Sequence, residues 1–386
     1  MKPDLIRLVA AQAILGSAMT LLVSITALAS KPIAPGVAWV TLPVSLQFVG
    51  LLMTTAPASY LMAIIGRRNG FLVGCALGML AGLLGAAALI YEAFGLLCVA
   101  SFLAGASNAF GQYYRFAAQE VVPEPQRARA LGWVMFGGVL AAFLGPQLSI
   151  FGRDALLVPF AGAYLAMAGL FAASFVGLLH LKLGKAERPP QGGRSIGQLL
   201  RDPNLIVAII AGITSYSVMA LLMNVTTLAM DRYGFEFAQV GLVIQWHVVM
   251  MFGPSFVTGH LMTRFGTRAV MLAGAILFLA CSALTQIGLE FGHFVAALML
   301  LGLGWNFLFL GATRAVGECL APAERARGQA LNETLVFGAT ALAVFFASPL
   351  ETQLGWQSLN IAMLGPILVV IALLTFIRGT TAARTS

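Results

Sequence analysis

Two pairs of side chains in the second half of the sequence have a spacing that suits metal binding. Met219 and Met223 are four residues apart, and so are His247 and Met251. Residues four apart on an α-helix lie one above the other, so each pair presents two donors to one side. Thioether and imidazole donors without carboxylates suit Cu(I) better than Zn²⁺ or Mn²⁺. The spacing therefore predicts a copper site formed by two neighbouring helices.

Three neighbours extend this candidate site. Met230 lies seven residues beyond Met223, near the end of the same predicted helix, where an ion would first bind; packing is the alternative role. Pro254 has no N–H to donate to the carbonyl oxygen of Met250. We therefore expect the helix to bend at Pro254 and to leave that oxygen free beside Met251.

Each pair also has a plain alternative. Methionine fills gaps in apolar cores, and with 16 Met in 386 residues chance alone gives about 0.7 Met-x-x-x-Met pairs. With 4 His, chance gives only about 0.2 His-x-x-x-Met pairs. His247 has the further alternative of a hydrogen bond to a neighbouring helix. The occurrence of both pairs on consecutive apolar segments favours the metal site.

The elements that carry these residues are membrane spans. Of the residues 60% are hydrophobic and 9% are charged, whereas soluble proteins carry about 25% charged residues. Apolar runs of about 20 residues are long enough to cross a bilayer. The first run, from Leu8, lacks a small-residue cleavage site and is interpreted as a span. The sequence therefore predicts an all-α membrane protein with twelve spans, centred at about residues 18, 50, 80, 107, 140, 169, 216, 250, 279, 306, 339 and 367.

The distribution of Lys and Arg predicts the orientation of these spans. With both termini in the cytoplasm, Lys31, Arg153 and Arg232 lie outside and the other 19 of the 22 basic residues lie inside. This asymmetry follows the positive-inside rule. It explains the net charge of +8 without nucleic acid, and the basic loops would also contact anionic lipid. We expect a monomeric, multi-pass membrane protein with both termini in the cytoplasm.

The chain divides into two halves of six spans. A polar segment rich in Pro and Gly separates residues 1–182 from residues 203–386, and residues 183–202 are interpreted as a cytoplasmic linker. The halves also repeat one another, since Gly66 and Gly266 are 200 residues apart in similar basic turns. Duplicated halves of this kind are typical of secondary transporters, in which the substrate binds between them.

Charged residues near the cytoplasmic ends of the spans form the predicted gate. We expect the turns after spans 2 and 8 to tie the two halves together in the outward-open state. We also expect Arg115 to pair with Glu120, and Arg314 to pair with Glu318. The turn residues in question are Gly66, Arg67 and Arg68 in the first half, and Arg264, Gly266 and Arg268 in the second.

These turns resemble the loop signature of the major facilitator superfamily, Gly-x-x-x-Asp-Arg-x-Gly-Arg-Arg, and the likeness extends over essentially the whole chain. The first copy keeps only Gly66-Arg67-Arg68. The second keeps the glycines and two of the basic residues but has Thr263 at the Asp position. The resemblance implies the major facilitator fold, with twelve transmembrane helices in two six-helix halves that alternate access to a central site.

Within that superfamily, the two pairs resemble those of the CcoA-like copper importers, also called the CalT family. Met219 and Met223 match the first motif of that family, and His247 and Met251 match the second. The resemblance implies import of copper across the bacterial inner membrane for the biogenesis of cbb3-type cytochrome c oxidase. Copper would be the substrate rather than a resident cofactor, and copper chaperones or oxidase-assembly proteins would be transient partners.

Two other functions stay open. One is a facilitator of an organic solute such as riboflavin or a drug, which would contact polar and aromatic residues of spans 1, 4 and 10: Gln12, Asn108, Gln112, Tyr113, Trp305 and Asn306. The other is a membrane protein that delivers copper without transporting it. Phosphate-binding loops, nucleophile elbows and zinc-protease motifs are absent from the sequence, so we expect no enzymatic activity. We place no Asp or Glu near the middle of a span, which leaves His247 as the mid-span group that titrates at ordinary pH.

Overall fold

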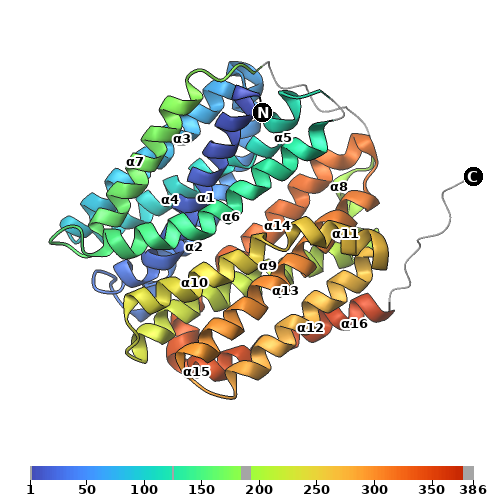
Figure 1. Cartoon of the computed structure of the whole chain (residues 1–386). Coiled ribbons are helices and arrows are strands. Elements are labelled where there is room, and N and C mark those ends of the chain that lie inside the picture. The colour runs from blue at the N-terminus through green and yellow to red at the C-terminus, as the bar shows by residue number, and fades with distance from the viewer. Residues whose placement is uncertain (1, 124–125, 184–192, 377–386) are drawn as a thin grey trace, which may run out of the picture.

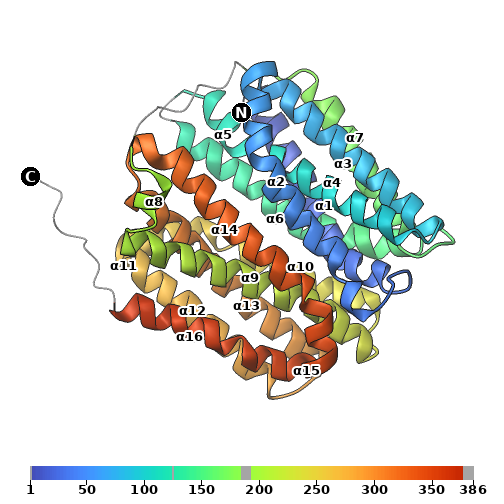
Figure 2. The same cartoon turned by 180° about the vertical axis from the view of Figure 1, so that it is seen from behind.

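The computed structural model describes residues 2–123, 126–183 and 193–376. Throughout these ranges the regular structure is helical. Figures 1 and 2 show two bundles lying side by side, one coloured blue to green and the other yellow-green to red. The prediction of an all-α protein is confirmed.

In residues 2–123 and 126–183, the N-terminal bundle has seven α-helices. Helix α1 packs chiefly against α6, while α4 packs against both α2 and α3. A short 3₁₀ turn, Val37–Trp39, precedes α2. The helices are α1 (Pro3–Ser30), α2 (Leu42–Ile65), α3 (Arg67–Ile90), α4 (Phe94–Gly111), α5 (Tyr114–Glu120), α6 (Arg127–Arg153) and α7 (Ala161–Leu178).

The C-terminal bundle repeats this plan. Helix α13 is its central element, since it packs against α9, α10 and α12. The short helix α8 precedes the first long one. The helices are α8 (Ile196–Leu199), α9 (Pro203–Arg232), α10 (Phe237–Phe252), α11 (Ser255–Phe265), α12 (Thr267–Thr285), α13 (Phe291–Cys319), α14 (Arg325–Phe345), α15 (Ala347–Ala362) and α16 (Leu364–Phe376).

The number of spans agrees with the sequence once α14 is considered. Within the described ranges, 10 helices are long and apolar enough to cross a membrane, or up to 11 when the bent pair α10 and α11 is taken as one span. Helix α14 has 21 residues but carries Asn332 and Glu333 in its middle part. These polar residues exclude α14 from a selection of spans by length and apolar composition. Helix α14 nevertheless packs between two of the long helices, α2 and α9.

The turn between the second and third spans of each bundle has the same backbone shape. Gly66 has φ of 87° and Gly266 has φ of 86°, a left-handed conformation that favours glycine. Each glycine N–H closes the preceding helix by donating to the carbonyl oxygen four residues earlier, at 3.0 Å in both cases. The repeat seen in the sequence is therefore a repeat of backbone geometry. We call the end of the molecule that carries these two turns and α8 the arginine-rich end.

At the opposite end, two pairs of helices join the bundles. Helix α2 packs against α14, and α6 packs against α10. The Ser45 hydroxyl donates to the Ala341 carbonyl oxygen at 2.7 Å. The Gln147 amide donates to the Gln245 side-chain oxygen at 2.9 Å. These contacts hold the bundles together away from the arginine-rich end.

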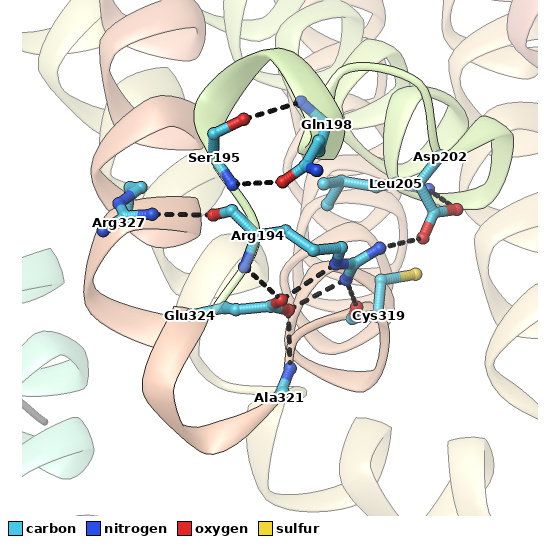
Figure 3. A network of polar contacts seen from close by, with 9 residues as sticks. All are labelled: Arg194, Ser195, Gln198, Asp202, Leu205, Cys319, Ala321, Glu324 and Arg327. Carbon is cyan, nitrogen blue, oxygen red and sulfur yellow. Dashed lines mark hydrogen bonds and ion pairs between the residues drawn. The ribbon is translucent and has the colours of Figure 1, made fainter. Parts of the chain in front are cut away.

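The segment that precedes α9 is fastened to the C-terminal bundle by Arg194 (Figure 3). Its guanidinium donates to both carboxylate oxygens of Glu324 at 2.9 Å, to Asp202 at 3.1 Å and to the Cys319 carbonyl oxygen at 2.7 Å. Arg327 donates to the carbonyl oxygen of Arg194 at 2.7 Å. The last part of the segment interpreted as a linker is thus attached to the α13–α14 connection. Its residues 184–192 lie outside the described ranges, and the proposed domain boundaries stay a prediction.

The Arg194–Glu324 contact gives a first prediction. Hydrogen bonds from Arg194 lower the pKa of the Glu324 carboxyl from 4.5 to about 2. A carboxyl whose pKa is lower in the folded chain stabilises the fold above its unfolded pKa, and this contribution is lost as the pH falls through the folded pKa. We expect the contact to persist from pH 7 to about pH 4.5 and to weaken from there to about pH 2.

The substitution Glu324→Gln removes this charge and is expected to speed amide hydrogen exchange over residues 194–202 at pH 7. Glu318→Gln is the matched control, because the Glu318 carboxylate pairs with Arg314 on the surface of α13. Hydrogen exchange measured by mass spectrometry checks this. Equal exchange of residues 194–202 in wild type and Glu324→Gln would refute the role given to Arg194.

Candidate functional site

The four predicted copper ligands lie on two helices that contact each other little. Met219 and Met223 are on α9, while His247 and Met251 are on α10, and all four side chains are buried. Helix α10 packs mainly against α13 and α6, and it meets α9 only over a short stretch. A copper site shared by all four residues therefore stays a prediction.

The ring of His247 is directed to α13. Its Nδ1 lies 2.7 Å from the Leu298 carbonyl oxygen. A carbonyl only accepts, so Nδ1 carries the proton and Nε2 keeps its lone pair. Nε2 is buried and lacks a hydrogen-bond partner within the described residues. His247 thus makes the hydrogen bond to a neighbouring helix that was the alternative to metal binding. The lone pair of its second nitrogen, Nε2, is still free to bind a metal ion.

The accessory methionines are placed differently from each other. Met230 is fully buried at the end of α9, which favours packing over first contact with an entering ion. Met250 is half-buried and lies beside α13, where a Cβ on Gly302 would be 3.2 Å from its own Cβ. Neither contact indicates a metal ligand.

The helix bends at Pro254, and Asn306 stabilises the bend. Helices α10 and α11 meet at an angle of 41°. The Asn306 amide nitrogen donates to the Met251 carbonyl oxygen at 2.6 Å and to the Ser255 hydroxyl at 2.7 Å. Its oxygen accepts from the Thr258 hydroxyl at 2.5 Å. Asn306, grouped in the sequence with residues that would contact an organic solute, is fully buried and satisfies a backbone carbonyl beside the break.

Five aromatic rings gather where the two bundles face each other, and we call them the Tyr216 cluster. The Tyr216 ring on α9 lies 6.2 Å from the centroid of Phe48 on α2. It lies 5.7 Å from Trp305 and 5.1 Å from Phe309, both on α13, and 5.3 Å from Phe337 on α14. Only Trp305 is buried; the other four rings are half-buried. One bundle supplies Phe48 and the other supplies the remaining four.

Two polar atoms near this cluster lack a partner. Within the described residues, the Trp305 indole N–H and the Asn332 side-chain oxygen are buried without a hydrogen bond. Asn332 lies on α14, and its oxygen would be 3.7 Å from a Cβ at Gly212, one turn before Tyr216 on α9. Buried polar groups usually have partners, so these atoms are candidates for contact with a bound molecule. Rings and hydrogen-bonding groups together suit a flat heteroaromatic solute.

The sequence indicated only one member of the cluster, Trp305. The others are scattered from Phe48 to Phe337 and have no common spacing. A signal was present in α14, where Asn332 and Glu333 lie just before the apolar residues that begin at Leu335. Polar residues inside a span usually face the bundle interior or a cavity. Asn332 and Glu333 therefore indicate which face of α14 is directed to the space between the bundles.

The charged pairs at the arginine-rich end correct one prediction. Glu120 pairs with Arg67 at 2.7 Å rather than with Arg115. Arg115 instead faces Glu333 on α14 at 3.8 Å. The reason is that Arg67, in the turn between the second and third spans, forms the ion pair with the Glu120 carboxylate. Arg314 does pair with Glu318, at 2.7 Å.

Glu333 also corrects the statement that no carboxylate lies near the middle of a span. Helix α14 begins at Arg325, so Glu333 lies about 12 Å along a helix of about 31 Å. Its side chain is 34% exposed. A titratable carboxylate therefore lies on α14 between its arginine-rich end and its middle, where it faces Arg115 of the other bundle.

One ion pair joins the bundles at each end within the described ranges. Lys31 and Asp231 are 2.6 Å apart at the opposite end, whereas Arg115 and Glu333 are 3.8 Å apart at the arginine-rich end. The tight pair accompanies the helix contacts at the opposite end, so the structure is the conformation closed there.

In the part of the chain that the structure describes, the polar contacts of the basic turns stay within one bundle each. Arg67 binds Glu120 within the N-terminal bundle, and Arg268 donates to the Thr375 carbonyl oxygen at 2.6 Å within the C-terminal bundle. Arg264 lies over the ring of its neighbour Phe265 at 5.3 Å. The role expected of these turns concerns the outward-open state and stays a prediction.

Comparison with known proteins settles the family. The profile described as Major Facilitator Superfamily matches residues 8–256 and 248–386. The chain belongs to the major facilitator superfamily. This membership agrees with the all-helical fold and makes the protein a multi-pass membrane transport protein rather than an enzyme.

Three relatives of the chain have curated names. The riboflavin transporter RfnT of Brucella anthropi is 38% identical over 362 residues, which cover 92% of this chain and 91% of the relative. Two uncharacterized MFS-type transporters of Bacillus subtilis are more distant. YddS is 29% identical over 307 residues, 73% of this chain and 70% of the relative. YdeG is 27% identical over 340 residues, 83% and 79% respectively. The narrower resemblance to CcoA-like copper importers has no support among these relatives.

The two ion pairs between the bundles give a second prediction. Both pairs are partly exposed, with side-chain exposures of 55% and 42% for Lys31 and Asp231. Exposed pairs contribute about 0.2–1 kcal/mol, which shifts a two-state equilibrium by up to about five-fold. Asp231→Asn should therefore increase the population that is open at the opposite end, and Glu333→Gln should decrease it.

Pulsed electron paramagnetic resonance checks these populations. Spin labels at Leu157 and Tyr233, exposed residues of the two bundles, report their separation after replacement of the four native cysteines. Glu290→Gln, at an exposed residue of the same end, is the control. A distance distribution unchanged by Asp231→Asn would contradict the role of this pair in closure.

Proposed function

We propose that this protein carries a flat, conjugated organic solute such as riboflavin across the bacterial inner membrane by alternating access. The observation that carries the proposal is the Tyr216 cluster, which brings five aromatic rings from both bundles to one place. The name of the relative RfnT, a riboflavin transporter similar over most of both chains, supports the same class of solute. The organic-solute alternative thus has better support than copper import.

The chemistry of the cluster fits a neutral tricyclic ring. Aromatic rings attract one another in offset-stacked or edge-to-face geometries at centroid distances of about 4.5–7 Å. The indole N–H of Trp305 would donate to a ring carbonyl, and the Asn332 amide would accept from a ring N–H. A solute held there would contact Phe48 of one bundle and Tyr216 of the other, so its binding would be sensitive to their relative movement.

The arginine-rich end would face the cytoplasm. The positive-inside rule supports this orientation, because three basic residues of the described ranges, Lys31, Arg153 and Arg232, lie toward the other side. Both termini would then be cytoplasmic. The conformation in this structure would be closed to the outside, and Glu333 would lie on the cytoplasmic side of the central site.

Copper import for the biogenesis of cbb3-type cytochrome c oxidase is the second candidate. One observation favours it, namely the buried Nε2 of His247 without a partner in the described residues. The limited contact between α9 and α10 speaks against a site shared by both motif pairs. A copper-delivery protein without transport activity has no observation in its favour.

The proposal predicts the effect of two substitutions at one position. Tyr216→Ala should lower the uptake of radiolabelled riboflavin by proteoliposomes at least about five-fold, because stacking on an aromatic side chain contributes about 1–3 kcal/mol. Tyr216→Phe keeps the ring, and its uptake should stay within about two-fold of wild type. Equal uptake by Tyr216→Ala and wild type would remove the cluster from the substrate path.

The same assay separates the two candidate substrates. Met223→Leu preserves side-chain volume while removing the sulfur, and His247→Ala removes the imidazole. Both variants should retain riboflavin uptake within about two-fold if the solute binds at the Tyr216 cluster. Copper uptake by wild-type proteoliposomes that is lost in both variants, without riboflavin uptake, would establish copper import instead.

A further inference from the structure

A cavity of about 760 Å³ lies at the opposite end of the molecule, between the two bundles. Its size falls in the range of about 300–1,000 Å³ that is typical of sites for small organic molecules. Its walls come from the end of α1, the end of α6 with the loop that follows, and the α9–α10 connection. The lining residues used in the argument below are Lys31, Arg153, Phe160, Asp231 and Phe237.

The floor of this cavity is closed toward the middle of the membrane. Ile150 packs against Gly241, where an added Cβ would lie 2.8 Å from its Cδ1. One turn deeper, Gln147 donates to Gln245 at 2.9 Å. Asp231 in the cavity wall and Tyr216 are 15 residues apart on α9, which is about 22 Å along the helix. The cavity is therefore a separate site in this conformation.

Arg153 lines this cavity with its guanidinium held over two aromatic rings. Its guanidinium lies over the ring of Phe160 at 5.7 Å and over the ring of Phe237 at 5.2 Å. The nearest carboxylate oxygen, on Asp154, is 3.7 Å from Nε, which is beyond hydrogen-bond distance. Nε is buried and has no partner in the described residues. The side chain as a whole is 40% exposed, so a carbonyl oxygen of a bound molecule would accept from the terminal N–H groups of this guanidinium.

The aromatic wall around Arg153 is formed by both bundles and held in place. The rings of Phe160 and Phe237 are 5.2 Å apart at an interplanar angle of 76°. Phe160 has φ of 66°, a left-handed conformation that is uncommon for a bulky residue and recurs at ligand sites. Its N–H donates to the Arg153 carbonyl oxygen at 2.8 Å, which fixes the loop. The ring is thus positioned before any ligand arrives.

We propose that this cavity is an outer binding site, where the solute waits before the outer end opens. The inference rests on the proposed function and names the same flat, conjugated molecule as its ligand. Its carbonyl edge would accept from Arg153 while its ring packs on Phe237. Acidic side chains at Asp154, Asp231 and Glu236 accompany the two basic ones in the wall, which disfavours an anionic ligand.

The site also explains the location of the Lys31–Asp231 pair. Both residues line the cavity, and their contact at 2.6 Å joins the two bundles. A solute bound between Arg153 and Phe237 lies next to the pair that has to part before the outer end opens. Binding there raises the local concentration of solute at the closed entrance.

Uptake kinetics in proteoliposomes test the outer site. Arg153→Ala removes the donor, and Phe237→Leu keeps an apolar side chain while removing the ring. Both should raise KM for external riboflavin at least three-fold while changing Vmax by less than about two-fold. Arg153→Lys keeps the charge without the planar fork, and it should not restore KM. Leu157→Ala, at a fully exposed residue of the same loop, is the matched control.

Binding of radiolabelled riboflavin to the purified protein provides a second measurement. Wild type should show two classes of site, and Arg153→Ala should lose one of them while Tyr216→Ala loses the other. Wild-type KM and two binding classes in both Arg153→Ala and Phe237→Leu would overturn the outer site and leave the proposed function intact. A wild-type protein that neither binds nor transports riboflavin would overturn both.

Discussion

The contact of α2 with α14, and of α6 with α10, is the interaction on which the conformation of the whole molecule depends. At the opposite end these helices meet through direct hydrogen bonds, from Ser45 to Ala341 and from Gln147 to Gln245. At the arginine-rich end the bundles face each other through the wider Arg115–Glu333 pair. Alternating access requires that this asymmetry reverse. The residues of these helices that lie between the two ends at the surface between the bundles, among them Phe48 and Phe337, are therefore the ones that a solute can contact from both sides.

The low polarity of the bilayer explains why residues with metal-binding chemistry have structural roles here. A buried donor or acceptor without a partner is costly in a membrane. His247 meets this requirement at Nδ1, which donates to the Leu298 carbonyl oxygen, while its Nε2 has no partner in the described residues. Asn306 meets the requirement for the backbone beside Pro254. Both side chains connect α13 to α10. They stabilise the C-terminal bundle whether or not a metal ion ever binds there.

The sequence predicted the fold well because its signals are local. The apolar runs specify the helices, and the glycines at positions 66 and 266 specify two equivalent turns. Partners were harder to predict, because spacing along one helix says nothing about a competing residue from another element. The assignment of Glu120 to Arg115 failed for that reason, since Arg67 lies closer. The direction of the His247 ring and the assembly of the Tyr216 cluster likewise depend on packing between distant segments.

The structure of the protein saturated with riboflavin would test the central claim most directly. The account predicts a bound tricyclic ring in contact with Tyr216 and Phe48, with its polar edge toward Trp305 and Asn332. A ring found only in the outer cavity would contradict the account. So would a copper ion at His247 in protein exposed to copper and riboflavin together, with the Tyr216 cluster left without solute.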